Sequence, residues 1–508
     1  MKRDFQEITP EAAGIPSAAI AAFIDRLHDK ALPMHSILVL KGDRIAAEAY
    51  WKPFDRSFRH RMYSTSKSFV SVAIGILAGD GRLSLADRVV DFFPDYQEKC
   101  APVHPYAAMA TVRDLLKMTT CFNVSDYARF DDWTEAFFRI PAGHLPGKSF
   151  RYDTLATVML CMIVRRVAGV EFMAFLQKRL FDPAGMSADL QCIQSPCGHD
   201  WGGSGVLCTT RDLAKFAYLC MHGGRWDGEQ LIPGDYLGAA TSRQVDNTLT
   251  NTDPEHQHGY GYQFWRTRFG FACRGMGSQL AVCVPDRELI LVTTADTQAV
   301  ACGDSIIYDA LDGLVLKEMS EAPLAEDPPA HAALQAKIAG LSLRPVDGAK
   351  RSPAAGEIDG RTYVLDGNSM KMKYVRFTFE DDEGVLAYEN ATGAHEIRFG
   401  FGKQVRQTFP ETHYYGRTMM RPGGRGYDCQ ASAAWCGDAS LLLCVYATDE
   451  YFGTLRMNFV FAGDTVTVQA EKFAEMFFDE YQGFTSGKAG SKGSPQDGCL
   501  LPSGPGSS

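Results

Sequence analysis

The sequence predicts an α+β fold, in which helices flank an antiparallel sheet, followed by a separate all-β barrel or sandwich. Up to about residue 320, helical patterns and strand-like runs are mixed without the regular alternation of βαβ units. Beyond about residue 345, short alternating runs follow one another at spacings of roughly 8–12 residues, separated by Gly, Asp and Asn turns. A chain of 508 residues has room for two or three domains, each with its own core.

Local patterns define the elements of the first domain. Residues 17–27 place apolar side chains at helical spacing behind Ser17, which we expect to cap the helix. Two strand-like runs joined by Lys41-Gly42-Asp43 predict a β-hairpin. The further elements expected here are helices over about 64–78 and 154–167, each closed by glycine, and a buried strand within 285–295.

Composition marks the domain boundaries. The first domain covers 1–320, and the acidic, proline-rich stretch 321–344 is typical of a linker. The β domain covers 345–485, and the tail 486–508, rich in Gly, Ser and Pro, is predicted to be disordered. The strands expected in the β domain are 374–380, 384–389, 395–400, 440–446, 455–461 and 465–469.

Charge and composition exclude several classes of protein. Hydrophobic residues make up 45% and charged residues 22%, which is ordinary for a globular protein and excludes wholesale disorder. The net charge of −10 argues against a nucleic-acid-binding protein. No apolar run is long enough for a membrane-spanning helix, and the N-terminal residues lack the apolar stretch of a signal peptide. The 14 cysteines lack paired spacing, so we expect reduced thiols and a cytoplasmic protein.

Ser64 and Lys67 form the sharpest local motif, S-x-x-K at the start of a predicted helix. Their spacing puts both side chains on one face of that helix. The N–H groups of the first turn and the positive helix end favour negative charge that develops at Ser64. A desolvated lysine with a lowered pKa can take the proton of the serine hydroxyl and make it a nucleophile. About one such match is expected by chance in a chain of this length, so the motif depends on its surroundings.

Two further segments contain the residue types that such chemistry needs. Tyr152 precedes a predicted helix, where a tyrosine can act as a phenolate or relay a proton to the leaving group. An ordinary half-buried tyrosine is the simpler interpretation. The run 273–279 (CRGMGSQ) places small residues at a strand edge, where a backbone N–H can complete an oxyanion hole. A plain glycine-rich turn is the alternative interpretation there.

The candidate metal motifs are weaker. His256 and His258 form an H-x-H pair in a polar loop, which we expect to be solvated because no cluster of further ligands accompanies it. Cys192, Cys197 and His199 lack a second pair of the kind that zinc sites have. We therefore expect no metal and no organic cofactor.

Several segments occur in an order and at spacings that are more specific than any one motif. They are STSK at 64–67 with the helix that follows, TVRDLLKMTT at 111–120, PGKSFRYDTLATVML at 146–160, LFDPAGM at 180–186, GGSGVLCTTRDLAKFA at 202–217 and RGMGSQLAV at 274–282. On these segments, the chain from about 9 to 315 resembles the serine β-lactamase and penicillin-binding superfamily, on its class C, esterase and D-aminopeptidase side. The resemblance implies a β-lactamase-like transpeptidase fold, and the C-terminal domain resembles the lipocalin-like barrels appended to some of these hydrolases.

The resemblance also implies roles for individual residues. Ser64 would be the acylated nucleophile, Lys67 its base or electrostatic partner, and Tyr152 the general acid/base. The backbone N–H groups of Ser64 and Met276 would form the oxyanion hole.

The substrate-binding residues depart from the pattern of the family. Thr154 stands where the Tyr-x-Asn motif has its amide, and Cys273-Arg274-Gly275 replaces the Lys-Thr-Gly element, in a register ambiguous by one or two residues. The missing lysine weakens a β-lactamase assignment, although Arg274 can supply charge to a substrate carboxylate. The substrate-binding residues expected from the resemblance are Thr154, Arg274, Gly275, Tyr262 and Trp265.

The predicted function is that of a serine hydrolase that cleaves an ester or amide/peptide bond of a small substrate through an acyl-enzyme, as an esterase, amidase or D-aminopeptidase does. The alternatives are a β-lactamase or penicillin-binding protein, and a catalytically silent homologue that binds a ligand. No nucleic acid and no membrane is expected as a partner, and a homo-oligomer is compatible with the sequence. The role of the C-terminal β domain stays open.

Overall fold

The structure is a computed structural model of the whole chain, and it describes residues 4–251, 253–411, 418–419 and 424–490. It divides the chain into two compact units. The first unit runs to Ser342 and also includes Thr418 and Met419 from further along the chain, and the second contains the remaining residues from Leu343 onward.

The first unit is built on a seven-stranded sheet with the strand order β1-β3-β2-β12-β11-β10-β9. Neighbouring strands are antiparallel, except that β1 runs parallel to β3. The predicted antiparallel sheet is therefore confirmed apart from this short edge strand, and the predicted hairpin is β2–β3. The strands are β1 (Gln6–Glu7), β2 (Met34–Lys41), β3 (Arg44–Tyr50), β9 (Trp265–Arg266), β10 (Phe271–Gly275), β11 (Gln279–Val284) and β12 (Leu289–Ala295).

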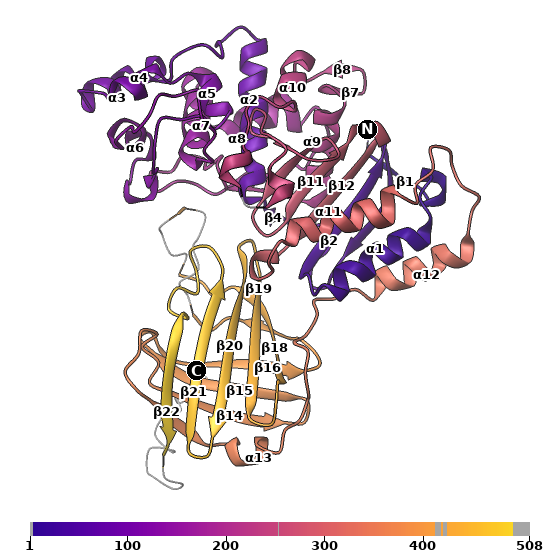
Figure 1. Cartoon of the computed structure of the whole chain (residues 1–508), viewed down its shortest axis with the longest axis vertical. Coiled ribbons are helices and arrows are strands. Elements are labelled where there is room, and N and C mark those ends of the chain that lie inside the picture. Colours follow the sequence, from indigo (N-terminus) through magenta and orange to yellow (C-terminus); the bar gives the residue numbers. More distant parts are fainter. Residues whose placement is uncertain (1–3, 252, 412–417, 420–423, 491–508) are drawn as a thin grey trace, which may run out of the picture. The chain divides into compact units, whose positions relative to one another are not determined.

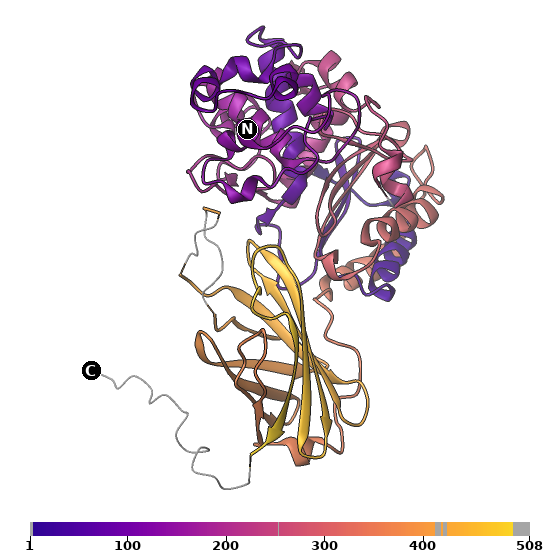
Figure 2. The ribbon, with the colours of Figure 1, turned by 60° about the vertical axis from the view of Figure 1, so that its left-hand side comes forward.

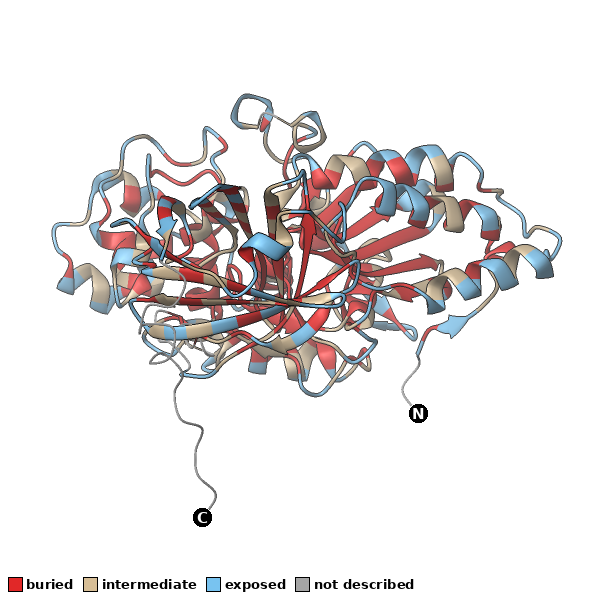
Figure 3. Cartoon of the chain, turned by 90° about the horizontal axis from the view of Figure 1, so that it is seen from below, coloured by how far each residue is buried: buried red, intermediate tan, exposed pale blue. Residues whose placement is uncertain are grey.

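Helices cover both faces of this sheet. α1 (Ser17–Asp29), α11 (Gly303–Ala310) and α12 (Pro328–Ala339) lie along one face (Figure 1). The long helix α9 (Thr210–Met221) packs on the opposite face, against β2, β11 and β12. Because side chains alternate between the two faces of a strand, both sets of strand residues are buried, and the central strands are buried along most of their length (Figure 3).

Two expectations for these helices need correction. Ser17 is the first residue of α1 rather than its cap, and its N–H and hydroxyl both donate to the carboxylate of Glu11. The stretch 321–344, expected to be a linker, contains α12, whose Leu334 is fully buried in the core of the first unit. The sequence of α12 hides the helix, because its two opening prolines resemble a linker although proline is favourable in a first helical turn.

The remaining helices of the first unit gather around α2 (Ser66–Gly79) and α7 (Thr154–Ala168), which pack on each other. Both agree with the helices predicted over 64–78 and 154–167, and Gly169 closes α7 with a φ of 76°. The others are α3 (Pro94–Lys99), α4 (Pro105–Met109), α5 (Val112–Leu116), α6 (Trp133–Arg139), α8 (Phe172–Leu176) and α10 (Gly234–Ala240). The short strands beside them are β4 (His60–Arg61), β5 (Gln191–Cys192), β6 (Val206–Cys208), β7 (Arg225–Trp226) and β8 (Glu229–Gln230).

The second unit is a β-barrel, which Figure 2 shows in orange to yellow. Nine strands form a closed ring because β16 pairs with β18, and β17 adds to β18. All six strands expected from the sequence are present, as β14, β15, β16, β19, β20 and β21. The strands are β13 (Thr362–Leu365), β14 (Tyr374–Glu380), β15 (Glu383–Asn390), β16 (Gly393–Phe401), β17 (Val405–Thr408), β18 (Asp428–Trp435), β19 (Ser440–Thr448), β20 (Phe452–Ala462), β21 (Thr465–Phe473) and β22 (Gly483–Ala489), with one short helix, α13 (Ala355–Ile358).

The start of the expected disordered tail is wrong. Ser486 to Ala489 form the second half of β22, which pairs with both β13 and β21. The remainder of the expected tail, from 491 onward, lies outside the described residues. Within the described part of the chain, no helix combines the length and apolarity needed to cross a bilayer.

Candidate active site

Ser64 lies in a short 3-10 turn, Tyr63–Thr65, that leads directly into α2. Tyr63 has a positive φ of 46° although it is not glycine, which is the kind of backbone strain that concentrates at functional sites. Every residue from His60 through Leu77 is buried except Ser64, which is half-buried. Its hydroxyl is therefore the side-chain group through which this segment reaches the surface.

Lys67 follows one turn later, and its nitrogen is anchored at two points. Nζ lies 3.0 Å from Ser64 Oγ and donates a second hydrogen bond of 2.6 Å to the backbone oxygen of Gly203. It also lies 5.1 Å from the centre of the Tyr152 ring. The lysine is 1% exposed. The structure thus brings Ser64, Lys67 and Tyr152 together, as the sequence predicts.

Arg61 holds the loop that contains Gly203, between β5 and β6. Its Nε donates to the backbone oxygen of Ser204 at 3.0 Å, and its Nη2 donates to Ser204 Oγ at 2.9 Å. The guanidinium carbon lies 4.1 Å from the ring centre of Tyr63 and 5.0 Å from that of Trp201. Arg61 is fully buried. It therefore ties the nucleophile turn to the loop whose carbonyl binds the lysine.

Tyr152 stands at the entrance of α7. Burial raises the pKa of its phenol to about 12, while a hydrogen bond with Ser64 and the charge of Arg274 act in the opposite direction. The phenol is therefore protonated at neutral pH. A protonated phenol can donate a proton, as a proton relay requires.

Asp153, which occupies the middle of the Tyr-x-Asn position, has a structural role. Its carboxylate caps α7 by accepting from the N–H of Leu155 at 2.9 Å, and it also accepts from Thr120 Oγ1 at 2.9 Å and Ser125 Oγ at 2.5 Å. Burial raises the pKa of this carboxyl, and the hydrogen bonds work against that shift. Because the cap fixes the backbone at Asp153, it also constrains Tyr152, the residue directly before it.

The third segment, at the end of β10, lies against the nucleophile turn. A Cβ added to Gly275 would come within 2.2 Å of the backbone oxygen of Met62 and 3.1 Å of the backbone nitrogen of Thr65. Only glycine permits this close approach of two backbones. Met276 follows directly and is 37% exposed, so its peptide lies where the strand reaches the surface.

Arg274 is held by a buried carboxylate. Its Nε donates to Asp304 at 2.5 Å, and Asp304 also accepts from Ser278 Oγ at 2.5 Å. His256 Nε2 lies 3.4 Å from the same carboxylate. Burial would raise the pKa of Asp304, but the Arg274 charge and the hydrogen bonds from His256 and Ser278 hold it well below its usual range. The charge of Arg274 is thus balanced locally.

Aromatic rings surround this arrangement. Trp265 lies 5.4 Å from Tyr152 and the same distance from the guanidinium of Arg274, measured from its ring centre. Tyr262 does not join them, because its ring packs 5.8 Å from that of Tyr236. Of the expected substrate-binding residues, the contacts therefore group Arg274 and Trp265 with Tyr152.

Thr154 lies beside the lysine-binding loop. A Cβ added to Gly203 would come within 2.7 Å of Thr154 Cγ2, so the threonine packs directly on the peptide whose oxygen binds Lys67. Thr154 is half-buried, so its hydroxyl position is compatible with a substrate contact.

Sequence reasoning missed four residues of this site. Gly203 lies in a segment that supported the resemblance only through its order along the chain. Arg61 precedes the first of those segments, and Asp304 lies in a helix without a motif. His256 belongs to the H-x-H pair expected to be solvated, yet its side chain is 13% exposed and packs 5.5 Å from the ring centre of Trp265. No group of three or more potential metal ligands occurs among the described residues.

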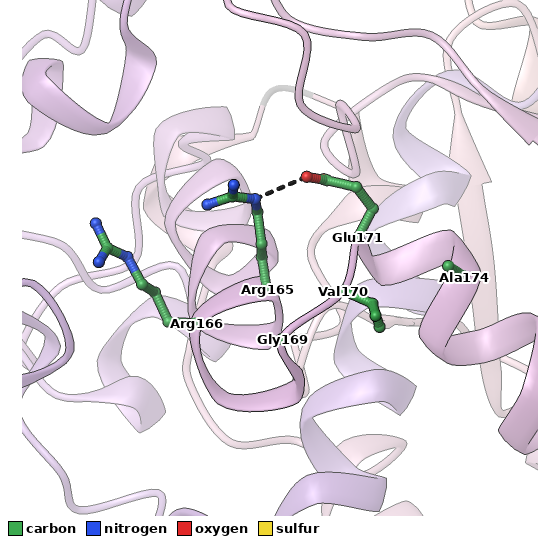
Figure 4. Close-up of a pocket in the computed structure, with 6 residues that line it drawn as sticks. All are labelled: Arg165, Arg166, Gly169, Val170, Glu171 and Ala174. Carbon is green, nitrogen blue, oxygen red and sulfur yellow. Dashed lines mark hydrogen bonds and ion pairs between the residues drawn. The ribbon is translucent and has the colours of Figure 1, made fainter.

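A separate pocket lies at the other end of α7 (Figure 4). Arg165, Arg166, Gly169, Val170, Glu171 and Ala174 line it. Arg165 donates to Glu171 at 2.7 Å, and Glu171 in turn lies 3.1 Å from His199 Nδ1. None of the catalytic candidates lines this pocket. Its first lining residue, Arg165, lies roughly 20 Å along α7 from Tyr152, at 1.5 Å per residue.

Comparisons with known proteins identify the family of this chain. The family model named Beta-lactamase matches residues 19–304, which is more than half of the chain. The chain therefore belongs to the Beta-lactamase family. This confirms the resemblance to the serine β-lactamase and penicillin-binding superfamily.

Individual relatives are more distant. The 6-aminohexanoate-dimer hydrolase of Paenarthrobacter ureafaciens is 25% identical over 256 residues, which cover 46% of this chain and 64% of that relative, less than two thirds of its length. The mitochondrial serine β-lactamase-like protein LACTB of Mus musculus is 26% identical over 137 residues, covering 21% of this chain and 24% of its own. A solved structure from Bacillus anthracis, named as a candidate 6-aminohexanoate-dimer hydrolase, shares the fold, with a TM-score of 0.50 at 17% identity. The match covers 63% of this chain and 89% of that structure's chain.

Proposed function

We propose that the protein cleaves an amide or ester bond of a small substrate through an acyl-enzyme on Ser64. The observation that carries the proposal is the 3.0 Å contact between Lys67 Nζ and Ser64 Oγ, at the half-buried point of an otherwise buried segment. Tyr152 adjoins both groups. Nucleophilic acyl transfer needs a nucleophile, a base and a proton donor in this arrangement, whereas a protein that only binds a ligand does not.

In the proposed reaction, uncharged Lys67 accepts the proton of Ser64 while Oγ attacks the substrate carbonyl carbon. The π electrons of the carbonyl move onto its oxygen, which the N–H groups of Ser64 and Met276 stabilise. As the tetrahedral intermediate collapses, Tyr152 donates its proton to the leaving nitrogen or oxygen and regains one from Lys67. Water then attacks the acyl carbon, its proton returns to Ser64 Oγ, and the free acid leaves.

An amide is the favoured bond. A relative is named for hydrolysing the dimer of 6-aminohexanoate, an amino acid. The pair Arg274–Asp304 offers hydrogen-bond donors to a substrate without a net positive charge. Thr154, Arg274, Gly275 and Trp265 are the proposed substrate contacts.

Intact mass spectrometry with a fluorophosphonate probe tests the nucleophile. Attack by Ser64 Oγ forms an O–P bond and expels fluoride, so we expect a single adduct in the wild type and none in Ser64→Ala. Hydrolysis of matched amide and ester substrates by the wild type then tests the bond preference. An unlabelled wild type that also fails to react with a penicillin would support the silent binding homologue instead.

A further inference from the structure

We propose that Gln279 is a positioning residue that sets the oxyanion hole, by fixing the turn 276–278 against the nucleophile segment. The inference rests on the proposed function, since it concerns the Met276 N–H that would bind the oxyanion. Gln279 is the first residue of β11 and is fully buried. Its side chain does not reach the substrate position and acts through the backbone of the turn.

The carboxamide of Gln279 is surrounded by backbone carbonyls. Its Nε2 lies 3.1 Å from the oxygen of Met276, 3.0 Å from that of Gly277 and 2.6 Å from that of Ala295. Three acceptors around one atom determine the orientation of the amide, because only the NH2 end can donate. The side chain therefore binds the two peptides that follow Met276 in the turn and anchors them to the end of β12.

The turn needs such an anchor because its backbone is strained. Gly277 and Ser278 both have positive φ, 75° and 64°, and Ser278 has a Cβ that disfavours this conformation. Ser278 is held through its hydroxyl by Asp304 and lies 2.7 Å from Thr297 Oγ1. Without the carboxamide of Gln279, the two carbonyls of Met276 and Gly277 lose a buried donor, and the turn can relax toward an unstrained backbone.

Gln279 also contacts the segment that contains Ser64. The backbone oxygen of Gln279 accepts a 2.8 Å hydrogen bond from Thr65 Oγ1, and Thr65 directly follows Ser64. Gln279 thus connects the two segments that supply the proposed oxyanion-hole donors, the N–H groups of Ser64 and Met276. Because such donors act only when they are held at the position of the developing charge, a residue that fixes both segments controls transition-state binding more than substrate binding.

Two substitutions separate this role from simple packing. Gln279→Glu keeps the shape but places carboxylate oxygens against three carbonyls, and Gln279→Met keeps the approximate volume without a donor. Gln263→Met is the matched control, because Gln263 is also buried and its side chain also donates to backbone carbonyls. These carbonyls are those of Leu115 and Leu116 in α5, each at 3.0 Å.

The readouts are the second-order rate of fluorophosphonate labelling, the inhibition constant of a phenylboronic acid, and kcat and KM on a substrate found as above. Both reagents form tetrahedral adducts on Ser64 Oγ whose oxygen occupies the oxyanion hole. We expect Gln279→Glu to lower the labelling rate and kcat by about 100-fold, with a matching loss of boronate affinity and KM within about threefold. Gln279→Met should give a smaller loss of the same kind, and Gln263→Met should melt earlier but be labelled at the wild-type rate.

Equal labelling of wild type and both Gln279 variants would overturn the inference while leaving the proposed function intact. The inference would also be overturned if the Gln279 variants lost no more labelling rate than Gln263→Met, compared at the same fraction of folded protein. If Gln279→Glu and Gln279→Met both fail to fold, Thr65→Val, which removes only the hydroxyl link, must slow labelling at least fivefold or the inference fails. A wild type that no probe labels would instead overturn the proposed function.

Discussion

Replacing Arg61 by methionine tests whether the loop that holds Lys67 depends on a buried guanidinium. The variant loses two charge-assisted hydrogen bonds to Ser204, each about 1.5–3 kcal/mol, and the stacking on two aromatic rings. Part of this loss is offset, because a buried cation no longer has to be desolvated. We therefore expect a net loss of about 3 kcal/mol in the free energy of unfolding.

This loss of stability corresponds to a small change in Tm, whereas we expect a large change in the reactivity of Ser64. With an unfolding entropy of about 2.1 cal/mol/K per residue over a unit that runs to Ser342, 3 kcal/mol lowers Tm by about 4 °C. Thermal melting followed by circular dichroism measures that shift. At 25 °C, where the fold persists, release of Ser204 should shift the neighbouring Gly203 carbonyl and leave Lys67 misplaced, so fluorophosphonate labelling of Ser64 should slow at least tenfold.

Arg211→Met is the matched control for this prediction. Arg211 also forms hydrogen bonds in the first unit, with Glu48 at 2.6 and 2.9 Å, but it lies on α9 and contacts none of the catalytic groups in the described interactions. Its loss should lower Tm without slowing labelling. If Arg61→Met is labelled at the wild-type rate, Arg61 only stabilises the fold and the reasoning about the loop is refuted.

Three further predictions concern single positions. Gly275→Ala should slow labelling at least 100-fold and lower Tm, since its Cβ would meet the oxygen of Met62 at 2.2 Å; wild-type kinetics would contradict the close approach. Tyr152→Phe should reduce kcat on amides at least 100-fold and kcat on activated esters less, because a good leaving group needs no proton donor. Equal losses of kcat on the two substrates in a steady-state assay would contradict the relay. Burial lowers the pKa of His60 to about 3 and that of His35 well below its usual value, so the unfolded chain binds protons that the folded chain does not. Stability should fall as pH drops below about 6.5, by about 1.4 kcal/mol per pH unit for each histidine, and urea titrations at pH 7, 6 and 5 should show a shallower slope in His60→Gln.

The helices and strands that the sequence predicted best are those in which every signal is local. The alternation in β14–β16 and β19–β21 is visible residue by residue, and the pairing of each strand with its neighbour follows from short turns. By contrast, α12 was hidden because its apolar side chains do not gather on one face and its two opening prolines resemble a linker. β22 was hidden by small residues that resemble a flexible tail but pair on both edges.

The sequence by itself predicted the contact between Ser64 and Lys67, because a spacing of three at the start of one helix places the two side chains together. It also predicted the helix that begins just after Tyr152 and small residues at a strand edge near Gly275, whose register it left ambiguous by one or two residues. Only the tertiary structure decided what holds these groups. The bond from Lys67 to Gly203 spans 136 residues and that from Thr65 to Gln279 spans 214. Such contacts depend on how the sheet, the α2–α7 pair and their loops pack together in space. The periodicity of residues along the chain does not predict that packing.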